Sequence, residues 1–392
     1  MNRTVVVLGA GVGGLSVVDS LRQHLPDSDR IVLVDKQDEQ FLGLSLLWVM
    51  RGWREPQEIT VHPSIVQERG VEFVKAEVES IALPERRVKT RGSGELAYDA
   101  LVIALGAALD SALIPGLEEV LRVGPAGEYY TLDGAVQLRE RLATFEKGRV
   151  CVLISRLPFK CPAAPYEGAL LLADLFSERG TRDAVQIDVF TPEGLPMPVA
   201  GPKVGGALVD ILQEHQIGFH PKTEVEKVDP QLREVVFKSG AREHYDFLLV
   251  IPPHRPPAPV VAARLGEQGW IPVDPGTLRT KAEGVWAIGD VAALPLRNGL
   301  FLPKAAVFAE GEAKVVAHDI ARHFGYEAPE PWFNGEGACW IEVGHGAAAS
   351  GGGNFLADPG PVVELRPPSA SQHLEKEEQE RAWIHSWSRT PI

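Results

Sequence analysis

The stretch Thr4-Val5-Val6-Val7-Leu8-Gly9-Ala10-Gly11-Val12-Gly13-Gly14 decides the fold of this chain. Its first five residues are apolar or β-branched and carry no charge, which predicts a buried strand. The glycines that follow have the spacing Gly-x-Gly-x-x-Gly, and the sequence predicts a helix from there to about residue 23. A strand, a glycine turn and a helix in this order form the dinucleotide-binding fingerprint.

Each glycine has a separate task in such a turn. Gly9 makes the tight turn, Gly11 leaves room for a pyrophosphate, and Gly14 lets the helix pack closely on the strand. The helix N-terminus presents free N–H groups to the phosphates. The next predicted strand, 31–34, ends at Asp35, whose carboxylate can accept a hydrogen bond from a ribose hydroxyl.

Two later segments indicate which dinucleotide is bound. The segment Tyr98–Ala107 is an apolar strand that closes on glycine, and Gly284–Asp290 is another strand that ends in Gly-Asp. Both are similar to segments of flavoproteins built from two dinucleotide folds, although Leu105 stands where threonine is usual there. The resemblance implies FAD. The cofactor-binding residues expected from these segments and their neighbours are Gly9, Gly11, Gly14, Asp35, Lys36, Val78, Gly106, Gly289, Asp290 and Lys304.

The middle of the chain alternates strands and helices a second time. The expected elements are strand 149–155, helix 166–179, strand 185–190, helix 203–215 and strand 216–220, followed by a β-meander from residue 224 to 237. The fold class is therefore α/β, with two Rossmann-like domains of the glutathione-reductase type. We expect an FAD domain at 1–112 and 248–324, a second domain at 113–247, and a C-terminal segment at 325–392.

The turn of the second domain departs from the fingerprint. It reads Arg156-Leu157-Pro158-Phe159-Lys160-Cys161-Pro162-Ala163-Ala164-Pro165, and no glycine occurs between Gly148 and Gly168. The backbone therefore cannot approach a pyrophosphate closely. A cysteine stands where phosphate binding is expected, so the sequence predicts a domain that presents a thiol instead of a nicotinamide cofactor.

The three cysteines have different settings. Cys161 precedes Pro162 at a predicted helix start and follows Lys160, so we expect a lowered thiol pKa and a reactive thiolate. Cys151 lies inside an apolar strand and is expected to be inert. Cys339 lies far along the chain, and the sequence does not show whether it meets Cys161. Without any Cys-x-x-Cys pair, no metal site is predicted.

The chain resembles the sulfide:quinone oxidoreductase and flavocytochrome c sulfide dehydrogenase group of flavoproteins over nearly its whole length. The segments that carry the resemblance are Gly9–Gly14, Tyr98–Ala107, Lys160–Glu167, Ala287–Asp290, Leu302–Glu310 and Gly337–Cys339. The segment around Cys161 and the Leu302-Pro303-Lys304 segment are the most specific.

The resemblance implies a function and roles for four residues. Cys161 and Cys339 are expected to flank the flavin ring as a redox pair that oxidises sulfide or a related persulfide or thiol. Lys304 would approach the pyrimidine end of the ring, where a cation stabilises reduced flavin. Glu167 would lie near the ring, either for proton transfer or to complement the helix dipole. Electrons would pass to a quinone or to a cytochrome-like acceptor protein.

The departures from the family matter as well. The stretches 123–130 and 40–48, where relatives carry a cysteine that bonds to the flavin, contain none. We therefore expect FAD held without a covalent bond. Trp270, Trp286 and Phe308 are expected in the core rather than in a quinone pocket. In the acidic tail, Trp383 and Trp387 share a helical face that Leu374 extends, and we expect this helix to dock on protein rather than on lipid.

Composition limits the partners. The chain has 392 residues, with 39 basic and 53 acidic side chains and a net charge of −14, which disfavours nucleic acid and anionic membranes. The first residues run directly into a strand without a secretory signal, and no apolar run is long enough to span a bilayer. We expect a cytoplasmic protein. A peripheral membrane contact and a homodimer stay open.

Two other functions stay open. A type II NADH dehydrogenase, an NADH:quinone oxidoreductase, uses the same fold, although the missing second glycine turn argues against it. A non-catalytic flavin-binding partner subunit is also compatible with the sequence, because the C-terminus is acidic and shows no clear membrane anchor.

Overall fold

The computed structural model describes residues 2–266 and 268–388. Its first domain is built on a five-stranded parallel sheet with the order β21-β9-β1-β2-β5. These strands are β1 Thr4–Leu8, β2 Arg30–Asp35, β5 Glu72–Lys75, β9 Ala100–Ile103 and β21 Val285–Ala287. Central β1 is fully buried from Val5 to Leu8, which explains its continuous apolar sequence.

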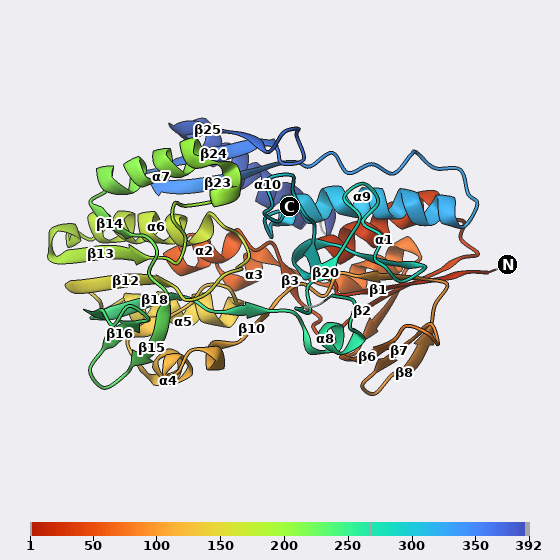
Figure 1. Cartoon of the computed structure of the whole chain (residues 1–392), viewed down its shortest axis with the longest axis horizontal. Helices are drawn as coiled ribbons and strands as arrows, with labels where there is room; N and C mark the ends of the chain where they lie inside the picture. Colours follow the sequence, from red (N-terminus) through yellow and green to blue (C-terminus); the bar gives the residue numbers. More distant parts are fainter. Residues whose placement is uncertain (1, 267, 389–392) are drawn as a thin grey trace.

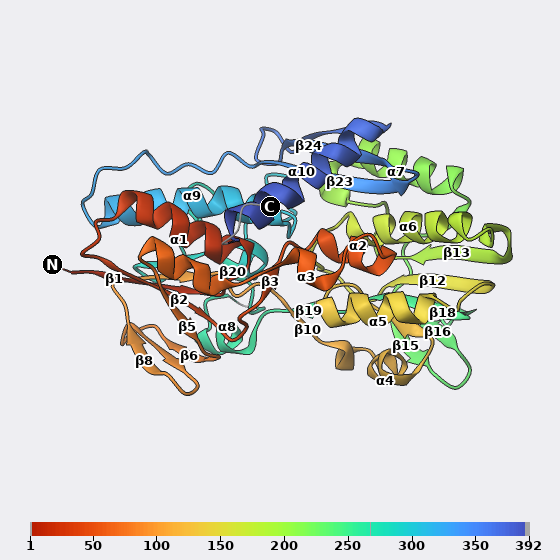
Figure 2. The same cartoon turned by 180° about the vertical axis from the view of Figure 1, so that it is seen from behind.

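Two helices from opposite ends of the first domain lie side by side over this sheet. They are α1 (Val12–His24) and α9 (Ala306–His323), as Figures 1 and 2 both show. A three-stranded antiparallel sheet is attached at one end of the domain, with β6 Val78–Ala82, β7 Arg87–Thr90 and β8 Gly94–Ala97. The chain therefore completes this domain only after passing through the second one.

The second domain repeats the parallel arrangement with the order β11-β18-β12-β13-β14. Its strands are β11 Ala126–Gly127, β12 Gly148–Ile154, β13 Val185–Phe190, β14 Ile217–His220 and β18 Phe247–Ile251, with helices α5 Leu132–Leu142, α6 Ala164–Glu178 and α7 Pro202–Glu214 around them. The antiparallel strands are β15 Val225–Asp229, β16 Glu234–Phe237 and β17 Arg242–His244. The predicted elements of this domain agree with these bounds within about two residues. Two Rossmann-like sheets confirm the expected fold class.

The structure corrects one domain boundary. The second part of the FAD domain was expected to begin at residue 248, but Phe247–Ile251 forms β18, which pairs with β12 inside the second sheet. An apolar run alone does not reveal which of two parallel sheets a strand joins. The chain crosses between the domains at β10 (Ala108–Leu109) and β19 (His254–Arg255), which pair with each other.

The C-terminal segment forms a third layer across both domains. After α9 the chain runs back along that helix as a long irregular segment to β23 Glu336–Gly344, which pairs with β24 Ala347–Asn354 and, through it, with β25 Val362–Ser369 (Figure 1). Helix α10 (Ala370–Ser386) then packs on β24 (Figure 2). The shorter elements are α2 Ser45–Arg51, α3 Pro56–Ile59, α4 Leu117–Val123, α8 Ala258–Ala263, β3 Gln40–Phe41, β4 Thr60–Val61, β20 Ile271–Pro272 and β22 Ala292–Ala293.

Candidate functional site

The glycine turn between β1 and α1 has the geometry that a dinucleotide needs. A Cβ added to Gly9 would lie 2.3 Å from the carbonyl oxygen of Ala104, and one added to Gly14 would lie 1.7 Å from the carbonyl oxygen of Gly9. Both positions therefore exclude a side chain on steric grounds alone. Gly11 is different, because a Cβ there would meet no atom within 4 Å. The space beside Gly11 is thus open to a ligand at the N-terminus of α1.

Asp35 lies at the end of β2, beside the glycine turn. Its carboxylate accepts hydrogen bonds from the N–H of Ala10 at 2.6 Å and from the N–H of Gln37 at 2.8 Å. Each oxygen keeps a further lone pair for a hydroxyl donor. Burial raises the pKa of Asp35, although both N–H groups oppose that shift. Lys36 is exposed next to it, and Val78 is buried at the start of β6.

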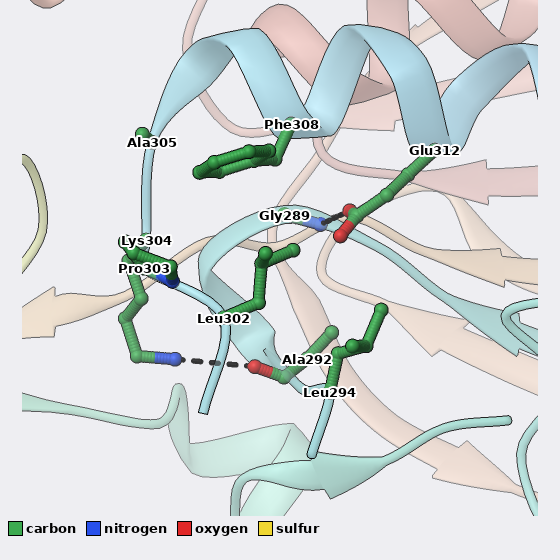
Figure 3. Close-up of a pocket in the computed structure, with 9 residues that line it drawn as sticks. All are labelled: Gly289, Ala292, Leu294, Leu302, Pro303, Lys304, Ala305, Phe308 and Glu312. Atoms are coloured by element: carbon green, nitrogen blue, oxygen red, sulfur yellow. Dashed lines mark hydrogen bonds between the residues drawn. The ribbon is translucent and has the colours of Figure 1, made fainter. Parts of the chain in front are cut away.

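The Gly289-Asp290 turn is supported by a glutamate that the sequence reading missed. Glu312 on α9 is almost fully buried and accepts a hydrogen bond from the N–H of Gly289 at 2.6 Å (Figure 3). Burial raises the pKa of Glu312 to about 7. Gly289 and Gly106 both adopt positive φ, at 68° and 65°, a conformation that glycine reaches without strain. Helical spacing did not reveal Glu312, because an acidic residue in a helix is usually exposed.

Lys304 precedes α9 and is partly buried rather than a surface lysine. Its ammonium donates hydrogen bonds to the carbonyl oxygens of Asp290 at 2.5 Å and Ala292 at 3.2 Å, the second of which Figure 3 shows. The ring of Trp270 lies 3.8 Å from the same ammonium. Burial lowers the pKa of Lys304 to about 8, while nearby Asp290 and Glu312 oppose the shift.

These residues fit FAD. The open space at Gly11, the carboxylate of Asp35, the Gly289-Asp290 turn and the ammonium of Lys304 all belong to the first domain and lie around the C-terminal ends of its parallel strands. Ligands of doubly wound α/β folds bind at this edge of the sheet. A pyrophosphate would meet N–H donors at α1, and a cation would be available from Lys304.

The second-domain turn meets this site directly. The N–H of Cys161 donates to the carbonyl oxygen of Lys304 at 2.6 Å, so the turn with the cysteine is tied to the Leu302-Pro303-Lys304 segment. Strand β23 runs along α6 and brings Cys339 to the start of that helix. The thiol of Cys339 is close enough to raise the pKa of Cys161 by charge repulsion. The structure therefore brings the two cysteines together as free thiols.

The expected lowering of the Cys161 pKa is wrong. Burial raises the pKa of Cys161 to about 12, and the neighbouring Cys339 and Glu167 raise it further. The N–H of Ala164 at the helix start does lower it, but this effect is the smaller one. Burial likewise raises the pKa of Cys339 to about 11. Cys151 is fully buried in β12 with a pKa of about 12, in line with the inert role expected for it.

Glu167 lies on the first turn of α6 and has a partner that the sequence did not suggest. Its carboxylate forms an ion pair with the ammonium of Lys376 on α10, and the two side chains are 3% and 2% exposed. Burial raises the pKa of Glu167 to about 7, although Lys376 acts to lower it. A lysine in a highly charged helix is usually solvated, so only the fold could show that this one is buried.

The ion pair continues into β23 and back to α10. Glu342 is fully buried, with its carboxylate 3.8 Å from the ammonium of Lys376 and 3.0 Å from Nδ1 of His373. Arg54 adds ion pairs from the α2–α3 connection to Glu377 and Glu380 on α10. Charged groups, as much as apolar ones, hold α10 on the protein.

The C-terminal helix α10 packs on protein as expected, but only part of its predicted apolar face is buried. Trp383 and Trp387 are buried against the first domain, and the guanidinium of Arg69 lies 4.6 Å from the ring of Trp387. The helix therefore docks on its own chain. The prediction that Leu374 extends this apolar face is wrong, since its side chain is 58% exposed. It lies on the opposite side of the helix, which faces solvent.

A large apolar pocket opens beside the thiols. Its volume is about 810 Å³, and its wall includes Cys339, Lys304, Trp270 and Phe308. The expectation of a core position is wrong for Trp270, which is only partly buried and lines this pocket. It holds for Phe308, which is 3% exposed and belongs to the core of the first domain, although one side of it also borders the pocket. Trp286 is core, with a side chain that is 1% exposed.

Over residues 2–266 and 268–388, no cluster of side chains suited to a metal ion occurs, and no helix is long and apolar enough to cross a bilayer.

Comparisons with known proteins agree with this geometry. The mitochondrial sulfide:quinone oxidoreductase of Mus musculus is 24% identical over 365 residues, which cover 91% of this chain and 79% of that protein. The sulfide-quinone reductase of Aquifex aeolicus is 25% identical over 382 residues, covering 92% of this chain and 84% of that protein. A crystal structure of the Aquifex aeolicus sulfide:quinone oxidoreductase matches with a TM-score of 0.84 at 23% identity, covering 99% and 93% of the two chains.

A family model supplies the classification. The model described as pyridine nucleotide-disulphide oxidoreductase matches residues 3–152 and 169–313, which is most of the chain. The gap between the two matched parts contains the Cys161 turn, where the second glycine motif is missing. The chain belongs to the pyridine nucleotide-disulphide oxidoreductase family, and it is a flavoprotein oxidoreductase similar to the sulfide:quinone oxidoreductases.

Proposed function

We propose that this protein oxidises sulfide, or a related persulfide or thiol, through a redox pair formed by Cys161 and Cys339. FAD would accept two electrons from this pair and pass them to a quinone or to a cytochrome-like protein. One observation carries the proposal: the turn that lacks glycines presents Cys161 next to Lys304, and β23 brings Cys339 to the same place. The named relatives, which are sulfide:quinone oxidoreductases, support this choice of substrate and acceptor.

The sulfur chemistry follows from a thiol–disulfide exchange. Hydrosulfide attacks one sulfur of a Cys161–Cys339 disulfide, and the S–S bond breaks. One cysteine then carries the persulfide, and the other leaves as a thiolate with the electron pair of the broken bond. Oxidation of hydrosulfide to the sulfane level releases two electrons and one proton. Glu167 is the group proposed to take up that proton, because it lies on the first turn of α6, directly after the Cys161 turn, and burial raises its pKa to about 7.

The apolar pocket is the proposed site for the electron acceptor. A quinone ring and its isoprenoid tail need an apolar cavity, and this one is lined by Trp270, Phe308 and Leu302 next to Lys304. Leu300 and Phe301 also line the pocket and have exposed side chains. A peripheral membrane contact at this rim belongs to the same proposal, because quinones partition into the bilayer.

The first prediction tests the substrate. Anaerobic addition of sulfide to the FAD-loaded protein should bleach the flavin absorbance within seconds, and a short-chain quinone should then restore it. NADH at the same concentration should leave the flavin oxidised, because the second-domain turn has no glycine for a pyrophosphate. The measurement is stopped-flow absorbance of the flavin band.

Other results of this experiment separate the alternative functions. Rapid bleaching by NADH with no response to sulfide would support a type II NADH dehydrogenase and contradict our proposal. Flavin that stays oxidised with sulfide, persulfide and NADH would support a non-catalytic flavin-binding subunit.

A second prediction concerns the attachment of FAD. Acid precipitation of the holoprotein should leave FAD in the supernatant, because the stretches 40–48 and 123–130 hold no cysteine that could bond to the flavin. The measurement is the absorbance of pellet and supernatant after washing. Yellow colour retained by the pellet would show a covalent bond and contradict the prediction.

A further inference from the structure

Lys376 is a buried cation that the C-terminal helix brings to the thiol pair. The residue is 1% exposed, and its ammonium contacts the carboxylates of Glu167 and Glu342. The ring of Trp48 lies 5.0 Å from it. Removing an ammonium from water costs several kcal/mol, so such a group is kept dry only where negative charge surrounds it. A buried lysine is not needed to dock α10, because Arg54 already forms ion pairs with Glu377 and Glu380 of this helix.

The charge of Lys376 lies beside both cysteine-bearing segments, because its partner Glu167 is on the first turn of α6, directly after the Cys161 turn, and its partner Glu342 follows Cys339 on β23. It favours the thiolate of Cys161 and that of Cys339, whereas the negative charge of Glu167 disfavours both. Two other lysines lie near the turn: Lys160 precedes Cys161, with its ammonium 5.8 Å from the ring of Tyr130, and Lys304 is held by the carbonyl oxygens of Asp290 and Ala292. The two charges of the Glu167–Lys376 pair therefore act on the sulfur atoms with opposite signs.

We propose that Lys376 is the counter-ion for the sulfur anion that forms at Cys161 and Cys339, and that Glu167 controls it by gaining or losing a proton. The proposal rests on the redox pair put forward above and adds the group that stabilises its charged state. When Glu167 is protonated, the ammonium loses the charge of its nearer carboxylate partner and can balance a thiolate or persulfide anion. When Glu167 is ionised, the two charges cancel and the sulfur anion loses its partner.

The surrounding groups are consistent with this control. Burial raises the pKa of Glu167 to about 7, so the carboxyl changes its charge near neutral pH. Glu342 faces Lys376 from β23 and is itself in contact with His373 of α10. The guanidinium of Arg54 lies 4.8 Å from the ring of Trp48, which also contacts Lys376. Lys376 thus faces two carboxylates, Glu167 from α6 as the nearer partner and Glu342 from β23 at 3.8 Å.

The test measures thiol reactivity and needs no sulfide. The reduced holoprotein is treated with iodoacetamide at about pH 9, and the peptides with Cys161 and Cys339 are quantified by mass spectrometry against Cys151, the buried reference. Lys376→Met should slow alkylation of both thiols at least about tenfold, whereas Glu167→Gln should speed it several-fold. Lys376→Arg keeps the charge and should stay within about threefold of wild type.

Opposite signs separate a charge effect from a packing defect. Arg381→Met, which removes an exposed cation from the same helix, is the matched control and should leave both rates unchanged. Rates that shift in the same direction in Lys376→Met and Glu167→Gln, or no shift beyond that control, would overturn the proposal. If Lys376→Met fails to fold, Glu167→Gln decides alone: slower or unchanged alkylation overturns the proposal. If sulfide fails to bleach the flavin, the proposed function is wrong. The alkylation rates still test separately whether Lys376 stabilises the thiolates of Cys161 and Cys339.

Discussion

Replacing Cys161 by serine is expected to reduce the rate of flavin bleaching by sulfide more than about a thousandfold. The oxygen of serine cannot form the disulfide or carry a persulfide, so hydrosulfide has no sulfur atom to attack. Cys161 has a φ of 55°, and serine occupies that conformation about as readily as cysteine, so the fold should be retained. The measurement is anaerobic stopped-flow reduction of the FAD-loaded variant.

Cys151 provides the matched control for this variant. Its thiol lies inside β12 and donates a hydrogen bond to the carbonyl oxygen of His244 at 3.7 Å. Cys151→Ser should therefore bleach within about twofold of the wild-type rate. Cys339→Ser should behave like Cys161→Ser, because each cysteine needs the other to form the disulfide. A Cys161→Ser variant with full activity would exclude the redox pair.

The second large effect is expected in the glycine turn, where two alanine variants should fail for different reasons. The added Cβ of Gly14→Ala would lie 1.7 Å from a backbone oxygen, so α1 must move away from β1 and the fold should be lost or strongly destabilised. The added Cβ of Gly11→Ala meets no protein atom, so the apoprotein should melt within a few degrees of wild type. Its methyl group would occupy the space for the pyrophosphate, and FAD affinity should fall about a hundredfold.

Two measurements distinguish these outcomes. Thermal unfolding of the apoprotein reports the fold, and a titration of FAD followed by flavin fluorescence reports affinity. Gly206→Ala in α7 is the control, because that glycine lies in the second domain and also has no atom near its added Cβ. If Gly11→Ala binds FAD as wild type does, the cofactor does not lie against this turn.

The sequence predicted the parts of the site whose chemistry is local. The roles of Gly9, Gly11 and Gly14 could be predicted because a turn of this kind admits only glycine at fixed spacings. For the same reason, the lack of glycine around Cys161 predicts that this turn does not bind a second dinucleotide. The wrong domain boundary at residue 248 shows the limit of this approach, since β18 has the same apolar pattern whichever parallel sheet it joins.

What the sequence could not show depends on contacts between distant segments. Lys376 lies 209 positions after Glu167, and each alone is a typical solvated helix residue. The pKa of Cys161 was misjudged because helix position is visible in the sequence, but burial among Cys339 and Glu167 is not. The role of Trp270 was missed in the same way, because only the fold shows the pocket that it lines.

The most direct test of the central claim is peptide mapping of the two cysteines before and after one equivalent of sulfide. In the oxidised holoprotein we expect a single cross-linked peptide that joins Cys161 to Cys339. Sulfide should remove that cross-link, and the flavin should bleach in the same sample. Separate, alkylatable Cys161 and Cys339 in the oxidised protein, together with bleaching by sulfide, would contradict the account.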